Sequence, residues 1–583
     1  MRHPIPNRQT NGTIPALMII GIDLGTTNSL ASVFRDGRAE IIPNVHGEAL
    51  TPSVVGLDDN GELLVGRAAR DRLVTHPELT AAAFKRYMGT PRQLRLGDKL
   101  FRAEELSALV LKSLRADAEV FLGEPIGEAI ITVPAYFSDA QRKATRIAGE
   151  LAGLKVERLL NEPTAAALAY GLQERGADHT FFVFDLGGGT FDVSLLELFD
   201  HVMEVRASAG NNFLGGEDFV HRIMDGFVHH HDKRELLDDP ALRGLLYASA
   251  TRAMHELTSK ERATVSIPYR GTRLDWQIDD LTFHELTEPL LQKLRAPMER
   301  ALRDAKVRAS ELDDVVLVGG ASRMRIVREL VARLLGRIPS SHIDPDKTIA
   351  LGAAVQAGLK SRDAALKDVV MTDVCPYTLG TSVVRRDKHG RHSEGHYLPI
   401  IERNSTVPVS RVERLCTAYD DQQSVLVDVF QGESRLAADN IRLGELKLAV
   451  PPKPRGEVSI DVRFTYDING ILEVETTLVG TKDARRLLIE DNPGVLSREE
   501  IEARFKALAD LKIHPRERDE NRGLMARAER LYEEHLGEVR QAISERIQGF
   551  QEVLDTQDNE AVAAFRGGFA EWLERIETDP FLA

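Results

Sequence analysis

Two short stretches of this 583-residue sequence place an acidic residue, glycines and hydroxyl side chains directly after an apolar run. Residues 20–29 read IGIDLGTTNS, and residues 182–194 read FVFDLGGGTFDVS. Glycine lets backbone N–H groups approach anionic oxygens and permits the positive φ of a tight turn. Asp23 and Asp185 supply carboxylates of the kind that bind magnesium. The two stretches therefore predict a clamp for the phosphates and the metal ion of a nucleotide.

The repetition of this turn favours a nucleotide site over an ordinary hairpin. A single Asp-x-Gly-Thr turn is common in hairpins, whereas two of them at corresponding places in two half-domains indicate a shared site. Two glycine pairs add to the pattern: Gly215 and Gly216 open a predicted helix, and Gly319 and Gly320 follow an apolar run. A helix N-terminus preceded by glycines attracts anions. A lone glycine pair after a strand, however, is more often a simple turn.

The composition narrows the class of protein. The formal net charge is -15, which argues against a nucleic-acid backbone as the main partner because such binding relies on clustered Lys and Arg. The two cysteines, Cys375 and Cys416, are too few for a disulfide scaffold and lack metal-ligand spacing. No apolar run approaches the roughly 20 residues that span a bilayer. We expect a soluble protein of the reducing cytoplasm.

Changes of pattern along the chain predict several domains. Residues 1–17 lack the apolar core of a signal peptide and are expected to be a disordered extension. Residues 18–367 alternate strand-like and helix-like stretches, which is typical of an α/β domain, with helices predicted over 103–121 and 138–152.

The remainder of the chain has a different character. Residues 368–373 form a mostly apolar strip, and since flexible linkers are usually Gly, Ser or charged, we expect this strip to dock on a domain. Residues 374–493 show period-two alternation, for example in 424–430 and 460–466, and predict a β-sandwich. Residues 497–583 predict a short helical region that begins at a capping box. Its apolar positions, which indicate packing within the chain, are Leu524, Ala528, Leu531, Leu536 and Val539.

Five motifs then follow one another in a familiar order, at residues 21–29, 131–137, 161–167, 184–190 and 318–320. On these motifs the chain resembles the 70-kDa heat-shock chaperone family of the DnaK type. The sequences of its motifs are most similar to those of the divergent bacterial HscC branch. The resemblance covers residues 18 to about 500. It implies an α/β actin-like ATPase domain, an interdomain linker, a β-sandwich peptide-binding domain and an α-helical lid.

The resemblance also implies roles for individual residues of the ATPase domain. Lys85 matches the lysine that orients the attacking water, and Asp23, Asp185 and Glu162 match carboxylates that hold Mg²⁺ largely through water. Phosphoryl transfer to water needs this combination of charge neutralisation and a positioned nucleophile. The catalytic set implied by the resemblance is Lys85, Glu162, Asp185, Thr190, Asp23 and Asp192.

The implied ligands are ATP or ADP with Mg²⁺, and K⁺ is a further candidate ion. The nucleotide-binding residues implied by the resemblance are Gly25, Thr26, Thr27, Gly187, Gly188, Gly189, Gly215, Gly216, Met254, His255, Thr258, Gly319, Gly320, Arg323 and Asp346. The chain departs from the family near the base, where Thr251, Met254 and His255 replace an acid and two basic residues. We therefore expect ATP to bind more loosely than in a typical relative.

Two further sets of residues follow from the resemblance. The residues implied to couple the domains are Pro134, Arg142, Arg158, Asp368, Val369, Val370, Met371 and Asp373, where Arg158 matches a residue that receives J-domain partners. The residues implied to contact an extended apolar peptide are Val384, Leu415, Ala418, Val425, Val427 and Ile460. A stripe such as 425, 427 and 429 has a simpler explanation as the core of the sandwich. Thr372 and Thr381 stand where the family has aliphatic residues.

The implied function is that of an ATP-dependent chaperone of the stress response that binds extended apolar segments of unfolded proteins. Its implied partners are client polypeptides and a J-domain co-chaperone, while the need for a nucleotide-exchange factor stays open and no nucleic acid or membrane is expected. Two alternatives remain. One is a peptide-binding holdase that does not hydrolyse ATP, since the base pocket is altered. The other is a small-molecule kinase with an actin-like fold, which would need neither the apolar linker nor the sandwich and lid.

Overall fold

The computed structural model describes residues 18–489 and 519–578, apart from gaps at 59, 157, 172–177, 200–201, 341, 364–365, 367–369, 387–391, 468–469, 482–483 and 536. The chain divides into two compact units. Unit 1 contains Met1–Tyr377 together with Arg403–Val407, and unit 2 contains Thr378–Glu402 together with Pro408–Ala583. The predicted extension 1–17, linker residues Asp368 and Val369, and the start of the predicted lid at 497–518 lie outside the described residues.

The first large sheet of unit 1 carries the first glycine turn. Its strand order is β11-β10-β1-β2-β3, with β4 paired to β2. The strands are β1 (Met18–Asp23), β2 (Asn28–Arg35), β3 (Arg38–Ile42), β4 (Thr51–Pro52), β10 (Ile126–Val133) and β11 (Leu159–Asn161). Because β1 ends at Asp23 and the antiparallel β2 begins at Asn28, the turn and its acid lie at one edge of this sheet.

The second large sheet repeats this arrangement with the second glycine turn. Its strand order is β17-β12-β13-β14-β18-β21. The strands are β12 (His179–Leu186), β13 (Phe191–Phe199), β14 (Val202–Asn211), β17 (Asp314–Val318), β18 (Val370–Val374) and β21 (Thr406–Val407). The turn between β12 and β13 places Asp185 directly opposite Asp192 in the antiparallel register.

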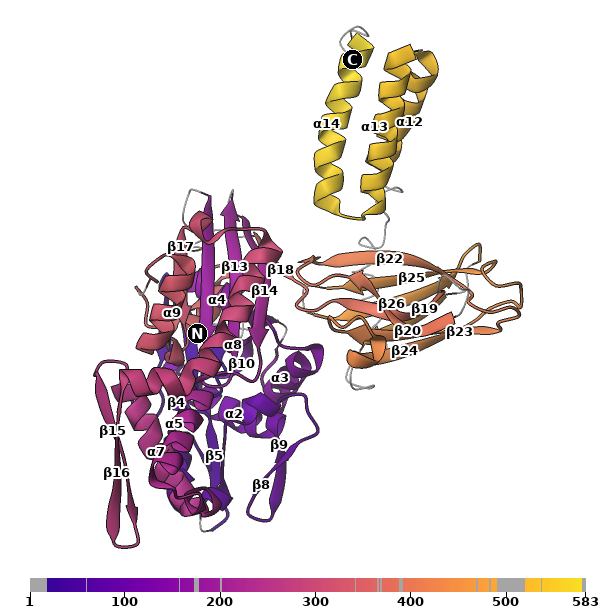
Figure 1. Cartoon of the computed structure of the whole chain (residues 1–583). Coiled ribbons are helices and arrows are strands. Elements are labelled where there is room, and N and C mark those ends of the chain that lie inside the picture. Colours follow the sequence, from indigo (N-terminus) through magenta and orange to yellow (C-terminus); the bar gives the residue numbers. More distant parts are fainter. Residues whose placement is uncertain are drawn as a thin grey trace, which may run out of the picture. The chain divides into compact units, whose positions relative to one another are not determined.

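Helices surround the two sheets (Figure 1). They are α1 (Arg67–Thr75), α2 (Ala103–Leu122), α3 (Asp139–Leu151), α4 (Glu162–Ala169), α5 (Gly216–His231), α6 (Glu235–Asp238), α7 (Pro240–Glu256), α8 (Asp280–Ala305), α9 (Arg325–Leu335) and α10 (Thr348–Lys360). The helices predicted over 103–121 and 138–152 are confirmed by α2 and α3. Ser138 caps α3 by accepting the N–H of Gln141, so the predicted range includes the caps of the helix.

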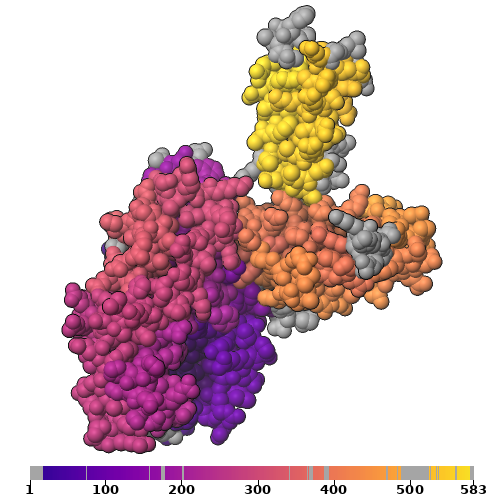
Figure 2. Space-filling model, in the orientation of Figure 1, coloured from indigo at the N-terminus to yellow at the C-terminus, as the bar shows by residue number. Residues whose placement is uncertain are grey.

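Smaller strands and 3₁₀ turns complete unit 1. The strands are β5 (Val54–Leu57), β6 (Leu63–Val65), β7 (Thr80–Ala82), β8 (Gln93–Leu96), β9 (Lys99–Arg102), β15 (Arg262–Tyr269) and β16 (Thr272–Asp279). The 3₁₀ turns are η1 (Pro77–Leu79), η2 (Phe84–Tyr87), η4 (Ala309–Glu311) and η5 (Gly320–Arg323). In Figure 2 the N-terminal segments, in indigo and purple, adjoin the magenta and pink segments of the middle of the chain on the visible face of this unit.

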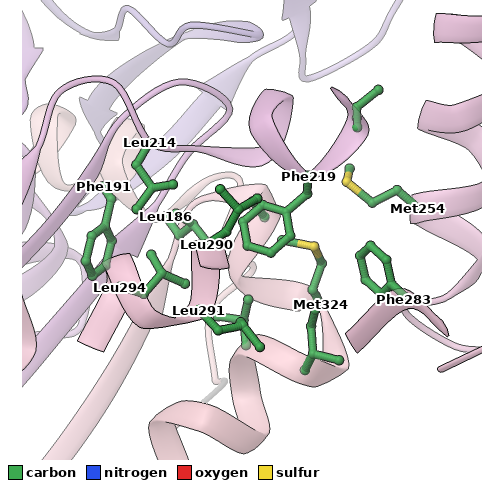
Figure 3. Packing of buried hydrophobic residues seen from close by; sticks show 14 of the residues in the cluster. Leu186, Phe191, Leu214, Phe219, Met254, Phe283, Leu290, Leu291, Leu294 and Met324 are labelled. Atoms are coloured by element: carbon green, nitrogen blue, oxygen red, sulfur yellow. The ribbon is translucent and has the colours of Figure 1, made fainter. Parts of the chain in front are cut away.

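A hydrophobic core packs against both ends of the second glycine turn. Leu186 and Phe191, which flank that turn, are fully buried and belong to the same cluster as Phe219 and Met324 (Figure 3). The core thus fixes both ends of the turn. At the first sheet, an added Cβ on Gly21 would lie 2.5 Å from the backbone carbon of Ala353, so only glycine allows α10 to approach β1 this closely.

Unit 2 contains two four-stranded antiparallel sheets, with strand orders β20-β19-β23-β24 and β22-β25-β26-β27. The strands are β19 (Leu379–Arg386), β20 (His392–Ile401), β22 (Val409–Cys416), β23 (Ser424–Gln431), β24 (Ile441–Ala449), β25 (Ser459–Tyr466), β26 (Leu472–Leu478) and β27 (Ala484–Ile489), and η6 spans Ala437–Asp439. The strands predicted at 424–430 and 460–466 are confirmed by β23 and β25.

Three helices complete unit 2: α12 (Asp519–Glu534), α13 (Gly537–Asp555) and α14 (Asn559–Thr578). They share a core of their own in which Phe550 stacks on Phe565. Leu524, Ala528 and Leu531 are buried in it and Val539 is partly buried, so the predicted packing within the chain is confirmed there, while Leu536 lies outside the described residues. Within the part of the chain that the structure describes, no helix has the length and apolar character required to cross a bilayer.

Candidate functional site

The two glycine turns of unit 1 face each other. A Cβ added to Gly188 would collide with the hydroxyl of Thr27, and one added to Gly189 would lie 2.6 Å from Cγ2 of Thr26. The turn after β1 and the turn after β12 are therefore in contact through threonines and bare glycine backbone. Glycine is needed at these positions because any side chain would separate the turns.

The other two glycine pairs adjoin the second turn. The N–H of Gly216 donates to the carbonyl of Gly187 at 2.9 Å, which places the start of α5 beside the turn. Gly319 has a φ of 78°, and a Cβ there would lie 2.8 Å from Oδ1 of Asp185. A Cβ on Gly320 would lie 2.6 Å from Oδ1 of Asp346. The four glycine segments predicted from the sequence thus meet at one place.

Three buried acids, the partly buried Asp23 and one buried lysine lie next to these turns. Lys85 lies in η2 and directs its Nζ to Oε1 of Glu162, the first residue of α4, at a distance of 3.1 Å. The charges of Lys85 and Glu162 both act on the pKa values of three acids, namely Asp23, Asp185 and Asp192. The chain thus buries several negative charges around a single ammonium group.

The pKa values of these acids reflect the crowding. Burial, followed by the charge of Glu162, raises the pKa of Asp23 to about 7. The same two causes raise the pKa of Asp192 to about 7, against the backbone N–H of Tyr136 and the charge of Lys85, which lower it. Burial and the charges of Glu162, Asp192 and Asp23 raise the pKa of Asp185. A cation bound here would relieve this repulsion and return the acids to their charged forms.

The set has the parts that phosphoryl transfer to water requires. Backbone N–H groups at glycine turns and at a helix start such as that of α5 can bind phosphate oxygens, and carboxylates can hold the waters of a magnesium ion. An ammonium group in a buried site stabilises charge that develops on the phosphate. Among the described residues, no group of three or more His, Cys, Asp or Glu side chains is arranged to hold a metal ion by itself.

One ion pair of this region was not predicted from the sequence. Nη2 of Arg86 lies 2.9 Å from Oδ2 of Asp218, and the same oxygen accepts the N–H of Gly215 at 2.8 Å. Arg86 therefore ties the turn that carries Lys85 to the start of α5. Neither residue lies in a pattern that separates it from other surface charges, and only its position next to Lys85 could have drawn attention to it.

The predicted base-binding residues lie on two sides. On α7, the side chain of Met254 is only 7% exposed and belongs to the hydrophobic core, near Phe283 in Figure 3. His255 is exposed, and the hydroxyl of Thr258 donates to its carbonyl at 2.6 Å. Across the sheet, Arg323 donates to Oδ2 of Asp346 at 2.8 Å and also pairs with Asp344. On this side, His255 of α7 and Thr258, which follows the helix, are thus the residues available to face a ligand.

A tyrosine of this helix and a glutamate of α5 were also missed by sequence reasoning. The hydroxyl of Tyr247 donates to the Glu217 carboxylate at 2.7 to 2.8 Å, and burial raises the pKa of Glu217. The hydroxyl of Thr251, which replaces the family's acid, donates to the carbonyl of Tyr247 at 2.8 Å. The polar group on this side of the site therefore comes from α5.

A comparison with protein-family models identifies the chain. The model described as Hsp70 protein matches residues 19–95 and 90–574. The chain belongs to the Hsp70 family. It is a chaperone of the Hsp70 type, and unit 1 has the actin-like ATPase fold of that family. The motifs on which the resemblance was based lie within the matched residues.

The predicted linker of this Hsp70 protein is in part a strand of unit 1. β18 pairs in parallel with β14, with Val370 opposite Val202 and Thr372 opposite Glu204. Asp373 is partly buried and accepts a hydrogen bond from Nδ2 of Asn161, and the charges of Arg142 and Arg158 act on it. Burial raises the pKa of Asp373 and lowers that of Arg158.

Two predicted coupling residues bracket a turn between the acids of the candidate site and this strand. Arg142 donates to the carbonyls of Phe137 and Ala135 at 3.2 and 3.0 Å, immediately after Pro134. A further segment of unit 1, Arg403–Val407, was not predicted from the sequence. Its Arg403 pairs with Asp304 at 2.9 Å and its Val407 pairs with Asp373 through β21.

In unit 2 the predicted peptide-binding residues are spread over both sheets. Leu415 on β22 lies directly opposite Ile460 on β25, while Val425 and Val427 share one face of β23. Ile460 and Val427 are buried, and Leu415 and Val425 are partly exposed, as are Val384 on β19 and Ala418 after β22. The hydroxyl of Thr381 is buried and donates to the carbonyl of Asp428 at 2.7 Å, which explains how a polar residue is accommodated there.

Proposed function

We propose that this Hsp70 protein hydrolyses ATP to ADP and phosphate and uses the reaction to control the capture and release of extended apolar peptides. The observation that carries the proposal is the buried pair of Lys85 and Glu162, 3.1 Å apart, beside two further buried acids, the partly buried Asp23 and the facing glycine turns. Such a cluster is costly to bury without a cation. Mg²⁺ with the nucleotide phosphates supplies the missing positive charge and a place for the phosphoryl group.

In this proposal each part of the site has a task. The glycine turns and the start of α5 bind the phosphates, with the hydroxyls of Thr26, Thr27 and Thr190 beside them. Asp23, Asp185 and Glu162 hold the waters of Mg²⁺, and K⁺ is a further candidate ion. Lys85 orients the attacking water, and Asp192 accepts hydrogen bonds nearby. His255, Thr258 and Arg323 contact the base or ribose, which leaves a loosely held nucleoside.

Unit 2 is proposed to bind the client. Its two sheets would act as a β-sandwich in which Leu415, Val425, Val427 and Ile460 line the channel and Ala418 and Val384 arch over it. The helices would form a short lid. An extended peptide can bond through its backbone and place apolar side chains in pockets, which gives broad selection. A client that prefers one nucleotide state must shift the nucleotide equilibrium in return.

The remaining assignments are also proposals. We place the chain in the HscC branch, in the cytoplasm, with a role in the stress response, and with a J-domain protein that engages Arg158. Whether a nucleotide-exchange factor takes part is left to experiment.

The test is steady-state ATP hydrolysis by the purified full chain, with and without an excess of an unfolded apolar peptide. Slow turnover that rises with peptide is the expected result. Folded protein that binds peptide but releases no phosphate under either condition would overturn the ATPase proposal. Phosphorylated sugar or glycerol as product, rather than free phosphate, would point to the kinase.

A holdase without hydrolysis is the second candidate, and one observation favours it. Met254 is in the core and Thr251 bonds its own helix, so α7 offers little polar contact to a nucleoside. Calorimetric titration with ATP and Mg²⁺ separates the two candidates. A holdase that no longer binds nucleotide would give no binding heat, whereas it would still bind peptide.

A further inference from the structure

The structure links the catalytic acids of unit 1 to a tyrosine that follows the docked strand β18. The backbone N–H of Tyr136 donates to Oδ1 of Asp192 at 3.0 Å. The carbonyl of the same residue accepts the hydroxyl of Tyr377 at 2.7 Å. Tyr377 lies three residues beyond the end of β18 at Val374, so it reaches this position when that segment is docked.

The contact between the two tyrosines is extensive. Their ring centroids are 4.5 Å apart, and Tyr136 lies on the turn that precedes α3. Burial, followed by the nearby Tyr136 and Asp192, raises the pKa of Tyr377, so its hydroxyl remains protonated and able to donate. Nδ2 of Asn212 donates to the same Tyr136 carbonyl at 2.9 Å, which makes a two-donor clamp.

Gly210 packs closely against both Asp192 and Tyr136. A Cβ on Gly210 would lie 2.6 Å from Oδ1 of Asp192 and 3.0 Å from Cβ of Tyr136. The Tyr136 N–H is one of the contacts that lower the pKa of Asp192 against burial. Losing the hold on the Tyr136 carbonyl would let this N–H drift from the carboxylate that it solvates.

We propose that Tyr377 is a positioning residue for ATP hydrolysis: its hydroxyl clamps the Tyr136 carbonyl and thereby holds the Tyr136 N–H on Asp192. The inference rests on the proposed ATPase function and deepens it. Because the clamp requires β18 to be docked, the geometry around Asp192 depends on the segment that leads into unit 2.

The experiment compares full-length Tyr377→Phe with the wild type for kcat and for the ATP concentration at half-maximal rate. Removing one buried hydroxyl donor is expected to lower kcat by roughly fivefold with KM unchanged, since the clamp does not touch the nucleotide. Hydrogen exchange of the Tyr136 amide should accelerate by a similar factor. Asn212→Ala should enlarge both effects when combined with Tyr377→Phe, because the two donors share one carbonyl.

Tyr397→Phe is the matched control, because it removes a hydroxyl that donates to the carbonyl of Thr378 at 2.9 Å within unit 2. An equal loss of kcat in this control would overturn the proposal, as would an unchanged kcat in Tyr377→Phe. Faster exchange of the Tyr136 amide with an unchanged kcat would show that the clamp serves only the structure, and this result would also overturn the proposal. A wild type that does not hydrolyse ATP would overturn the proposed function instead, and Tyr136 exchange would then test the clamp alone.

Discussion

Lys85 and Glu162 form a buried ion pair whose atoms Nζ and Oε1 are 3.1 Å apart, although the two residues lie in different elements and far apart in the sequence. The side chain of Lys85 is 4% exposed and that of Glu162 is 8% exposed. Their contact compensates part of the cost of burying both charges, while the neighbouring acids compete for the same ammonium group. The pair fixes the only lysine of η2 at the centre of the candidate phosphate site.

Replacing this lysine should strongly reduce hydrolysis. Lys85→Met removes the positive charge that offsets the developing phosphate charge, and we expect the hydrolysis rate to fall by about 100-fold or more. Phosphate release measures this. The exposed Lys112→Met on α2 is the control, and a rate for Lys85→Met equal to that of the control would contradict the role of Lys85.

The raised pKa values predict a pH-dependent stability of the nucleotide-free protein. Asp192 has a folded pKa of about 7 against an ordinary value of 3.8, so its contribution to stability is present below pH 4 and is lost as the pH rises through 7. Asp192→Asn should therefore raise the melting temperature relative to wild type more at pH 8 than at pH 5. Differential scanning fluorimetry at both pH values tests this, and equal shifts would show that Asp192 titrates normally.

The docked strand β18 contains a hydroxyl that has no hydrogen-bond partner in the described structure, that of Thr372. A buried unsatisfied polar group costs about 1–3 kcal/mol, so Thr372→Val should favour docking. Slower hydrogen exchange across residues 370–374 would report it. Thr476→Val on β26 removes a similarly unsatisfied hydroxyl within unit 2 and should leave that exchange unchanged.

Two neighbouring residues of β23 distinguish the proposed peptide channel from the opposite face. Val425→Phe places a bulky aromatic ring on the face shared with Val427. This change should weaken the binding of an extended apolar peptide by about tenfold. Leu426→Phe, on the opposite face and 50% exposed, should not. Fluorescence anisotropy of a labelled peptide compares them, and equal affinities would place the channel elsewhere.

Local sequence patterns predicted much of the fold because they depend on neighbours in the chain. Helices α2 and α3 follow from apolar spacing and, for α3, a capping residue, and strands β23 and β25 follow from period-two alternation. The four glycine segments could also be recognised, because a turn that closely approaches another backbone requires glycine, and this requirement is visible in the sequence. The family resemblance, carried by the order of these motifs, added the role of Lys85, which no local pattern separates from a solvated lysine.

Contacts between distant segments could not be predicted in this way. Met254 was expected at the nucleotide, yet the rotation of α7 directs it into the core, and the sequence around it is too weakly amphipathic to indicate that rotation. The ion pair of Arg86 with Asp218 and the hydrogen bond of Tyr377 to Tyr136 join residues whose identities are unremarkable in isolation.

The sequence by itself determined the glycine turns, the acids that end their strands, and the succession of α/β, strand-rich and helical regions, because each depends on residues close together in the chain. Only the tertiary structure decided which of these groups meet. The raised pKa of Asp23, the buried pair of Lys85 and Glu162, and the clamp on Tyr136 all arise from desolvation and from contacts closed across the two sheets. Those quantities depend on distance in space, which the order of residues alone does not give.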